Sequence, residues 1–158
     1  MSEKEIHRLC RKYNITNYTI NKDKSIDVNQ NVNLEYNKLK KIPLTFNEVK
    51  GNFSCGHNNI HSLKYSPNYI SGFFICNGNN LKTFNHFPNV NKFILLNYNP
   101  VNELWYLFNN KNYIDYFNEL DIIQDDENTV ILDRLNYFLT DIGKPEITKD
   151  SIKNYKVI

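Results

Sequence analysis

Four short stretches in which apolar and polar residues alternate occupy the middle of the chain, and an asparagine follows each of them. Shifting the sequence along itself by 21 residues superimposes the first three stretches, and a further shift of 20 brings in the fourth. Self-similarity at a short fixed period is typical of a solenoid, in which each repeat is one coil. The aligned positions are Val32, Leu34, Asn37 and Leu39; Phe53, Cys55, Asn58 and Ile60; Phe74, Cys76, Asn79 and Leu81; and Ile94, Leu96, Asn99 and Val101.

The alternation predicts one short β-strand per coil, because successive side chains of a strand point to opposite faces. Phe53 and Cys55 then point into the core while Ser54 points out, and stacked coils join their strands into a parallel sheet. The chain turns sharply after each strand, which leaves backbone groups to be satisfied inside. An asparagine amide both donates and accepts hydrogen bonds, so we predict a ladder of the four asparagines between neighbouring coils.

The segments that return from one strand to the next also repeat. Apolar residues follow the strands at a constant distance and precede them at another, and two glycines and two prolines align. The position three residues before each strand is polar, so we expect an irregular return path rather than a helix. The repeated residues are Ile42, Leu63, Phe84 and Leu104; Val49, Ile70 and Val90; Gly51 and Gly72; Pro67 and Pro88.

Segments at both ends break the period and are predicted to cap the solenoid, whose core is otherwise open at its ends. Ser2 and Glu5 have the spacing of a capping box, which predicts a helix over residues 3–13. Residues 18–28 predict a hairpin that turns at Asp23 and Lys24.

The C-terminal part has helical periodicity. One or two short helices are expected within residues 102–120, and another over 129–142 that ends at Gly143. The tail from Tyr155 predicts an added edge strand. The chain is therefore predicted to be one α+β domain: an N-terminal cap over 1–30, leucine-rich repeats over 31–104 and a helical cap over 105–158.

The repeats resemble those of short leucine-rich-repeat proteins of tailed bacteriophages and other large DNA viruses. Their coils follow the pattern Leu-x-x-Leu-x-x-x-Pro-x-x-Val-x-Gly-x-Phe-x-Cys-x-x-Asn, and the similarity covers roughly residues 18 to 140. The last coil departs from it, since it is one residue short and has Lys92 and Leu96 at the Gly and Cys positions. The resemblance implies the fold and a viral origin, and it implies no catalytic residue or cofactor. The residues that carry it best are Ile60, Leu63, Pro67, Ile70, Gly72, Phe74, Cys76 and Asn79.

Composition narrows the range of functions. The 158 residues carry a formal charge of only +2, which is far below that of a dedicated nucleic-acid binder. The charge is divided, at +7 over residues 1–100 and −5 over 101–158. The sequence shows no signal peptide and no apolar run of membrane-spanning length, and an odd number of cysteines does not indicate a disulfide framework. We therefore expect a protein of the cytoplasm, or of the virion if it is viral, and no membrane partner.

Two groups of residues invite a metal-site interpretation that the pattern disfavours. Cys55 and Cys76 fall where sibling coils carry leucine, so they are predicted to be small core residues rather than zinc ligands of His57 and His61. Cys10 falls on a predicted helix face without a matching His–Asp arrangement for nucleophilic catalysis. An acidic run lacks the glycine and regular alternation of a calcium loop and is expected to be solvated: Asp121, Asp125, Asp126 and Glu127. No metal or other cofactor is expected.

The outward positions of the strands are more informative. The first two coils place polar residues there, Asn31 and Asn33, then Asn52 and Ser54, whereas the last two place four large apolar ones. An apolar patch of that size usually marks a binding surface. The candidate partner-binding residues, with the asparagines of the third outward row, are Phe73, Ile75, Asn77, Phe93, Leu95 and Asn97.

Three occupants of this patch are possible at this stage: a partner protein, a second copy of the chain, or the chain's own C-terminal helices. A row of Lys40, His61 and Lys82 beside the strands is expected to be solvated, and nucleic acid is an unlikely partner. The sequence thus predicts a non-enzymatic protein-interaction module, with a virion or assembly component as the alternative.

Overall fold

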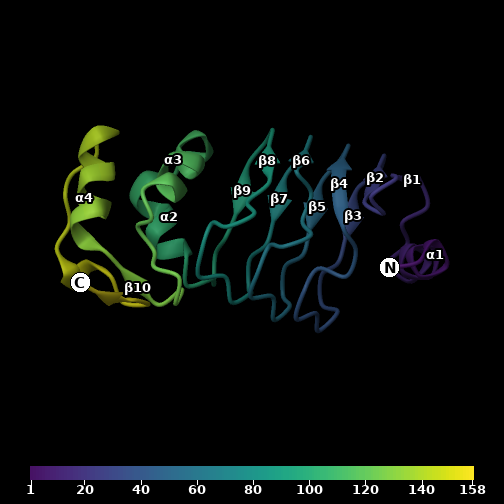
Figure 1. The fold of residues 1–158 in the computed structure, drawn as a ribbon, viewed down its shortest axis with the longest axis horizontal. Coiled ribbons are helices and arrows are strands. Elements are labelled where there is room, and N and C mark those ends of the chain that lie inside the picture. The colour runs from purple at the N-terminus through teal and green to yellow at the C-terminus, as the bar shows by residue number, and fades with distance from the viewer.

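The chain folds as an α+β solenoid with a cap at each end, and the computed structural model describes all of residues 1–158. In Figure 1 the coils stack along the long axis of the molecule, with a single helix at the N-terminal end and several helices at the C-terminal end. The predicted fold class, with both caps, is therefore confirmed.

One strand of each coil lies in a four-stranded parallel sheet, as the repeat predicts. Its register pairs Val32 with Phe53, Phe53 with Phe74, and Phe74 with Ile94, which is the alignment that the 21- and 20-residue shifts give. The strands, in sheet order, are β3 (Val32–Asn33), β5 (Phe53–Ser54), β7 (Phe74–Ile75) and β9 (Ile94–Leu95).

The return path has no helix, as predicted, but it is not wholly irregular. It contains a second sheet in which Val49, Ile70 and Val90 face the core, all at most 2% exposed. A polar residue directly follows each of these positions, and β6 and β8 are too short to show the alternation of apolar and polar residues that predicts a strand. The strands, in sheet order, are β1 (Tyr18–Ile20), β2 (Ile26–Val28), β4 (Phe46–Val49), β6 (Tyr69–Ile70) and β8 (Asn89–Val90). β1 and β2 form the predicted antiparallel hairpin, and the other pairs are parallel.

The asparagine ladder is present in the last three coils. The Asn79 side chain accepts a hydrogen bond from the Ile60 amide at 3.0 Å and donates to the carbonyls of Cys55 and Cys76 at 3.0 and 3.2 Å. Asn58 and Asn99 bridge neighbouring coils in the same way. Asn37 has no preceding coil to bridge, so its side chain is exposed and donates only to the nearby Glu35 carbonyl, although its backbone amide donates to the Asn58 side chain.

Replacing Asn79 with alanine should therefore destabilise the fold by about 1–3 kcal/mol, because the Ile60 amide loses its partner inside the protein and the Cys55 and Cys76 carbonyls each keep only the bond from a neighbouring asparagine. Urea denaturation of the wild type and the variant measures this cost. Asn37→Ala is the matched control and should cost only a few tenths of a kcal/mol. Equal effects of the two substitutions would contradict the ladder.

The N-terminal cap is the helix α1 (Glu3–Lys12), which buries Ile6, Leu9 and Cys10. The Ser2 hydroxyl accepts a hydrogen bond from the Glu5 amide at 3.2 Å, as a capping box requires. The Glu5 carboxylate does not complete the box, because it pairs instead with Arg8 at 2.7 Å.

The C-terminal cap holds the short helices that the periodicity predicts, and α2 crosses the boundary expected at residue 104. The predicted helix over 129–142 begins later, because residues 129–130 form a strand that pairs with the tail. The tail is thus a strand, as predicted. The elements are α2 (Asn102–Phe108), η1 (Lys111–Tyr113), α3 (Ile114–Glu119), β10 (Thr129–Val130), α4 (Leu132–Asp141), η2 (Lys149–Ser151) and β11 (Lys156–Val157).

Candidate protein-binding face

The four apolar residues on the outer side of β7 and β9 form one surface, which we call the apolar face: Phe73, Ile75, Phe93 and Leu95. The rings of Phe73 and Phe93 stack with centroids 4.0 Å apart. Phe93 and Leu95 are 51% and 38% exposed, whereas Phe73 and Ile75 are half-buried. The candidate residues therefore do come together at the last two coils.

The C-terminal helices do not cover this face. They stack on the end of the solenoid, beyond β9, and continue its long axis (Figure 1). Of the three occupants considered above, the chain's own helices are excluded by this placement and by the exposure of Phe93. Apolar side chains of this size remain open to an external partner.

The first two coils show what this scaffold does with polar residues at the same place. The Asn31 side chain accepts a hydrogen bond from the Asn52 amide at 2.8 Å, and the Asn52 side chain accepts one from the Phe73 amide at 2.9 Å. Each asparagine thus supports the backbone of the next coil. Phe73 ends this series, so the change from Asn to Phe gives up a backbone hydrogen bond in exchange for an exposed aromatic ring.

A glycine in the next coil makes room for each of these asparagines. A Cβ atom on Gly51 would lie 2.7 Å from the Asn31 side-chain oxygen, and one on Gly72 would lie 2.1 Å from that of Asn52. Where the asparagine is replaced by Phe73, the next coil has Lys92 in place of glycine, with its ammonium 5.3 Å from the Phe73 ring centroid. The loss of glycine in the last coil is therefore a consequence of the apolar face.

The third outward row borders the face with polar groups. The Asn77 amide nitrogen lies 3.2 Å from Nε2 of His57, and the Asn77 side-chain oxygen is buried without a hydrogen-bond partner. Asn97 is exposed. This row is consistent with a polar rim beside an apolar centre.

The residues considered for a zinc site are not gathered around one point. Cys55 and Cys76 are fully buried neighbours with their sulfur atoms 2.8 Å apart, and burial raises the pKa of the Cys55 thiol. His57 instead stacks on Tyr36, with ring centroids 4.5 Å apart, and His61 contacts Asn80. The cysteines occupy core positions, as predicted from the repeat.

The other two candidates also have structural surroundings. Cys10 lies on the buried side of α1, and that burial raises the pKa of its thiol. In the acidic run, Asp126 accepts hydrogen bonds from the backbone amides of Asn128 and Thr129, which lower the pKa of its carboxyl group. The run is exposed, and the Asp126 carboxylate holds a turn of its own loop.

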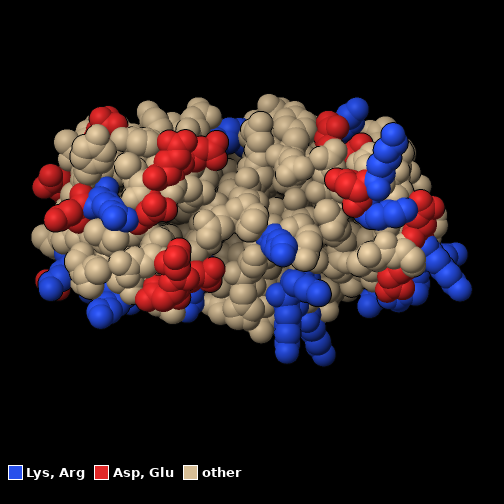
Figure 2. All heavy atoms as spheres, viewed as in Figure 1, with Lys and Arg blue, Asp and Glu red and all other residues tan.

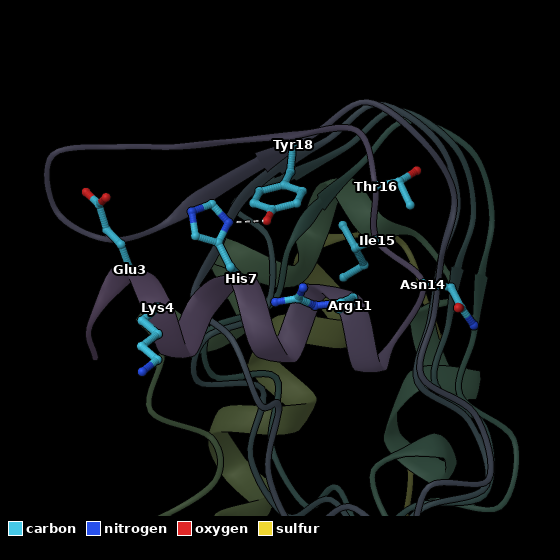
Figure 3. Close-up of a pocket in the computed structure, with 8 residues that line it drawn as sticks. All are labelled: Glu3, Lys4, His7, Arg11, Asn14, Ile15, Thr16 and Tyr18. Carbon is cyan, nitrogen blue, oxygen red and sulfur yellow. Dashed lines mark hydrogen bonds between the residues drawn. The ribbon is translucent and has the colours of Figure 1, made fainter.

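A groove of about 830 Å³ lies beside α1, at residues that the repeat pattern does not include. Figure 3 shows Lys4, His7 and Arg11 along one side of the helix, with His7 in contact with the Tyr18 hydroxyl. The spacing of these residues on the polar face of the predicted helix is the one feature of the sequence that indicates this groove. The groove is shallow and lies at the opposite end from the apolar face, so we do not include it in the candidate site.

A second hollow, of about 290 Å³, adjoins the apolar face at β9, and we call it the β9 pocket. It also escaped the sequence analysis, because it depends on where the C-terminal cap meets the last coil. Its lining consists of Lys92, Phe93, Ile94, Trp105, Asn109, Asn110 and Lys111.

Charge is distributed as the sequence indicates. Figure 2 shows acidic side chains gathered over the C-terminal helices and lysines projecting from the lower edge of the solenoid. In the predicted lysine row, Lys82 donates a hydrogen bond to the side chain of Asn128 at 2.7 Å. None of the helices has the length and apolar character that a membrane span requires.

Comparison with known proteins gives no relative: no protein family, no curated protein and no solved structure matches this chain.

Proposed function

We propose that this chain is a non-enzymatic protein-interaction module that binds a partner protein through the apolar face. The observation that carries the proposal is the exposed Phe73–Phe93 stack, at positions where the same scaffold places Asn31 and Asn52 in its first two coils. Stacked aromatic residues at the centre of a surface are typical anchors of protein interfaces.

The surroundings of the face support the same proposal. Asn77 and Asn97 border it with polar groups, as in the rim of a protein interface. Aliphatic side chains of Ile75 and Leu95 extend the apolar area beside the aromatic pair. The action of such a module is steric, through occlusion or recruitment. The resemblance to phage and viral repeat proteins further leads us to propose that it is virus-encoded and acts in the host cytoplasm or the virion.

The double variant Phe73→Asn/Phe93→Asn tests the proposal. Binding of the partner should weaken by at least about 30-fold, which corresponds to about 2 kcal/mol, the usual contribution of one such anchor. Phe93→Asn should change folding stability little, because no coil follows it in this sheet, whereas Phe73→Asn places an asparagine beside Lys92 instead of glycine and should cost some stability. Thermal melts therefore accompany the binding measurement, so that loss of binding is scored only in folded protein. The control is Tyr106→Asn/Tyr137→Asn, which removes two exposed aromatic residues, 68% and 61% exposed, from the C-terminal cap.

The measurement compares three immobilised proteins: wild type, face variant and control. Proteins from host extract that the wild type and the control retain, and the face variant loses, are then purified and titrated against all three. Equal capture by all three proteins would contradict the proposal. Sedimentation at two concentrations distinguishes self-association, which would appear as a wild-type dimer that the face variant fails to form.

A further inference from the structure

Backbone hydrogen bonds in the sheet of the apolar face extend from each coil to the next. The Phe74 amide donates to the Phe93 carbonyl at 3.0 Å, and the Cys76 amide donates to the Leu95 carbonyl at 2.9 Å. The equivalent amides of the preceding coil donate to β7 in the same way. Every coil therefore needs acceptors from the coil that follows it.

The last coil has no successor in this sheet. β9 is the final strand of the sheet, and the amides equivalent to those of Phe74 and Cys76 belong to Ile94 and Leu96. Neither of them donates a hydrogen bond within the chain. An unpaired strand edge of this kind is a template for another extended segment.

The other sheet ends differently. The Lys111 ammonium, from the C-terminal cap, donates hydrogen bonds to the carbonyls of Val90, Asn91 and Lys92, at and just after β8. A side chain thus takes the place of the missing coil there. The cap therefore satisfies the outer edge of one sheet and leaves that of the other unpaired.

The space beside the Ile94 end of the unpaired edge is open. The β9 pocket lies between Ile94 on one side and Trp105 and Lys111 of the cap on the other. Alternate residues of a strand added along β9 would face this pocket and the apolar face, next to Phe93 and Leu95. The helices of the C-terminal cap lie beyond β9, so a whole further coil does not fit there (Figure 1).

We propose that the partner contributes an extended apolar segment that adds to β9 as a fifth parallel strand. Its backbone carbonyls would accept hydrogen bonds from the Ile94 and Leu96 amides. One apolar side chain would enter the β9 pocket, and its neighbours would pack on Phe93 and Leu95. Main-chain bonds provide affinity in this binding mode, and the side-chain pockets provide specificity. This inference rests on the proposed function and adds the partner's conformation to it.

Peptides selected from a random display library against the full-length chain serve as the probe. Trp105 is the only tryptophan and lines the β9 pocket, so its fluorescence reports binding directly. Synthetic copies of a selected peptide are then methylated at one backbone nitrogen at a time. Because alternate amides of an added strand point toward β9, methylation should weaken binding at least tenfold at every second residue and leave the residues between unaffected.

The protein variant Ile94→Pro removes one of the unpaired amides and should weaken binding at least tenfold. Ile94→Val keeps that amide and is the matched control. Alternation in the methylation series together with selective loss in Ile94→Pro supports strand addition. Peptides that bind without alternation, yet lose binding in Phe73→Asn/Phe93→Asn, overturn strand addition and leave the proposed function intact. Peptides that are insensitive to both changes, or a selection that yields no peptide affecting Trp105, overturn it as well.

Discussion

Replacing Phe84 with alanine should lower the free energy of unfolding by about 3–5 kcal/mol, the usual cost of removing a buried aromatic side chain. Phe84 is fully buried at the junction between the third coil and the C-terminal cap. Its ring lies 5.1 Å from that of Phe117 and 6.3 Å from that of Trp105, measured between centroids. The cavity left by alanine would therefore open between the solenoid and the cap rather than within either.

Urea denaturation followed by circular dichroism gives the stability, and Trp105 fluorescence follows the cap in the same samples. In the wild type both signals should give one transition, whereas in Phe84→Ala the fluorescence transition should come at lower urea. Phe93→Ala removes the same side chain from an exposed position and should cost less than about 1 kcal/mol. Coincident transitions with a loss below 1 kcal/mol in Phe84→Ala would show that this contact does not join the two parts.

Gly72→Ala should be the most damaging addition of a single methyl group, at about 3 kcal/mol, the upper end of the cost of overpacking. The new Cβ atom would lie 2.1 Å from the Asn52 side-chain oxygen and 2.7 Å from the Gly51 carbonyl oxygen. The asparagine can rotate away only by giving up its hydrogen bond to the Phe73 amide. The Gly51 backbone cannot move without shifting the coil.

Thermal melts of Gly72→Ala, alone and combined with Asn52→Ala, measure how the cost divides. The second change removes one of the two clashes, so it should restore part of the lost stability but not all of it. Gly143→Ala has no atom within 4 Å of the added Cβ but a φ of +78°, so it measures the cost of a positive φ without a clash. Full recovery in the double variant would mean that the backbone contact is harmless.

The repeat register was predictable because the inward positions of the strands, such as Phe53 and Phe74, recur at a fixed spacing. The second sheet was not, since β6 and β8 are only two residues long and present a single buried residue each, Ile70 and Val90. Local pattern carries too little information there. Pairing between coils, rather than side-chain alternation, creates those strands.

The apolar face was predictable for the same reason as the register, because strand alternation decides which residues point outward. The unpaired amides of Ile94 and Leu96 were not, since every strand of the repeat looks alike in sequence. What distinguishes β9 is the placement of Lys111 and Trp105, which follow from long-range packing of the cap. The spacing of residues along the sequence does not predict where the cap places these two side chains.

The pairing of Asn52 with Gly72 also constrains how such an array can lengthen or shorten by duplication and deletion. Two residues in successive coils depend on each other: the outward residue of one coil, such as Asn52, and the residue opposite it in the next coil, such as Gly72. Copies made in that phase always place glycine beside asparagine. A rearrangement that placed Lys92 after the coil of Asn52 would set a side chain where only hydrogen fits. Recombination within the gene is thus restricted to junctions that keep each asparagine with its glycine. A coil with an outward asparagine such as Asn52 cannot be followed by a coil with Lys92, whereas a coil with an outward phenylalanine has no asparagine for a following side chain to meet.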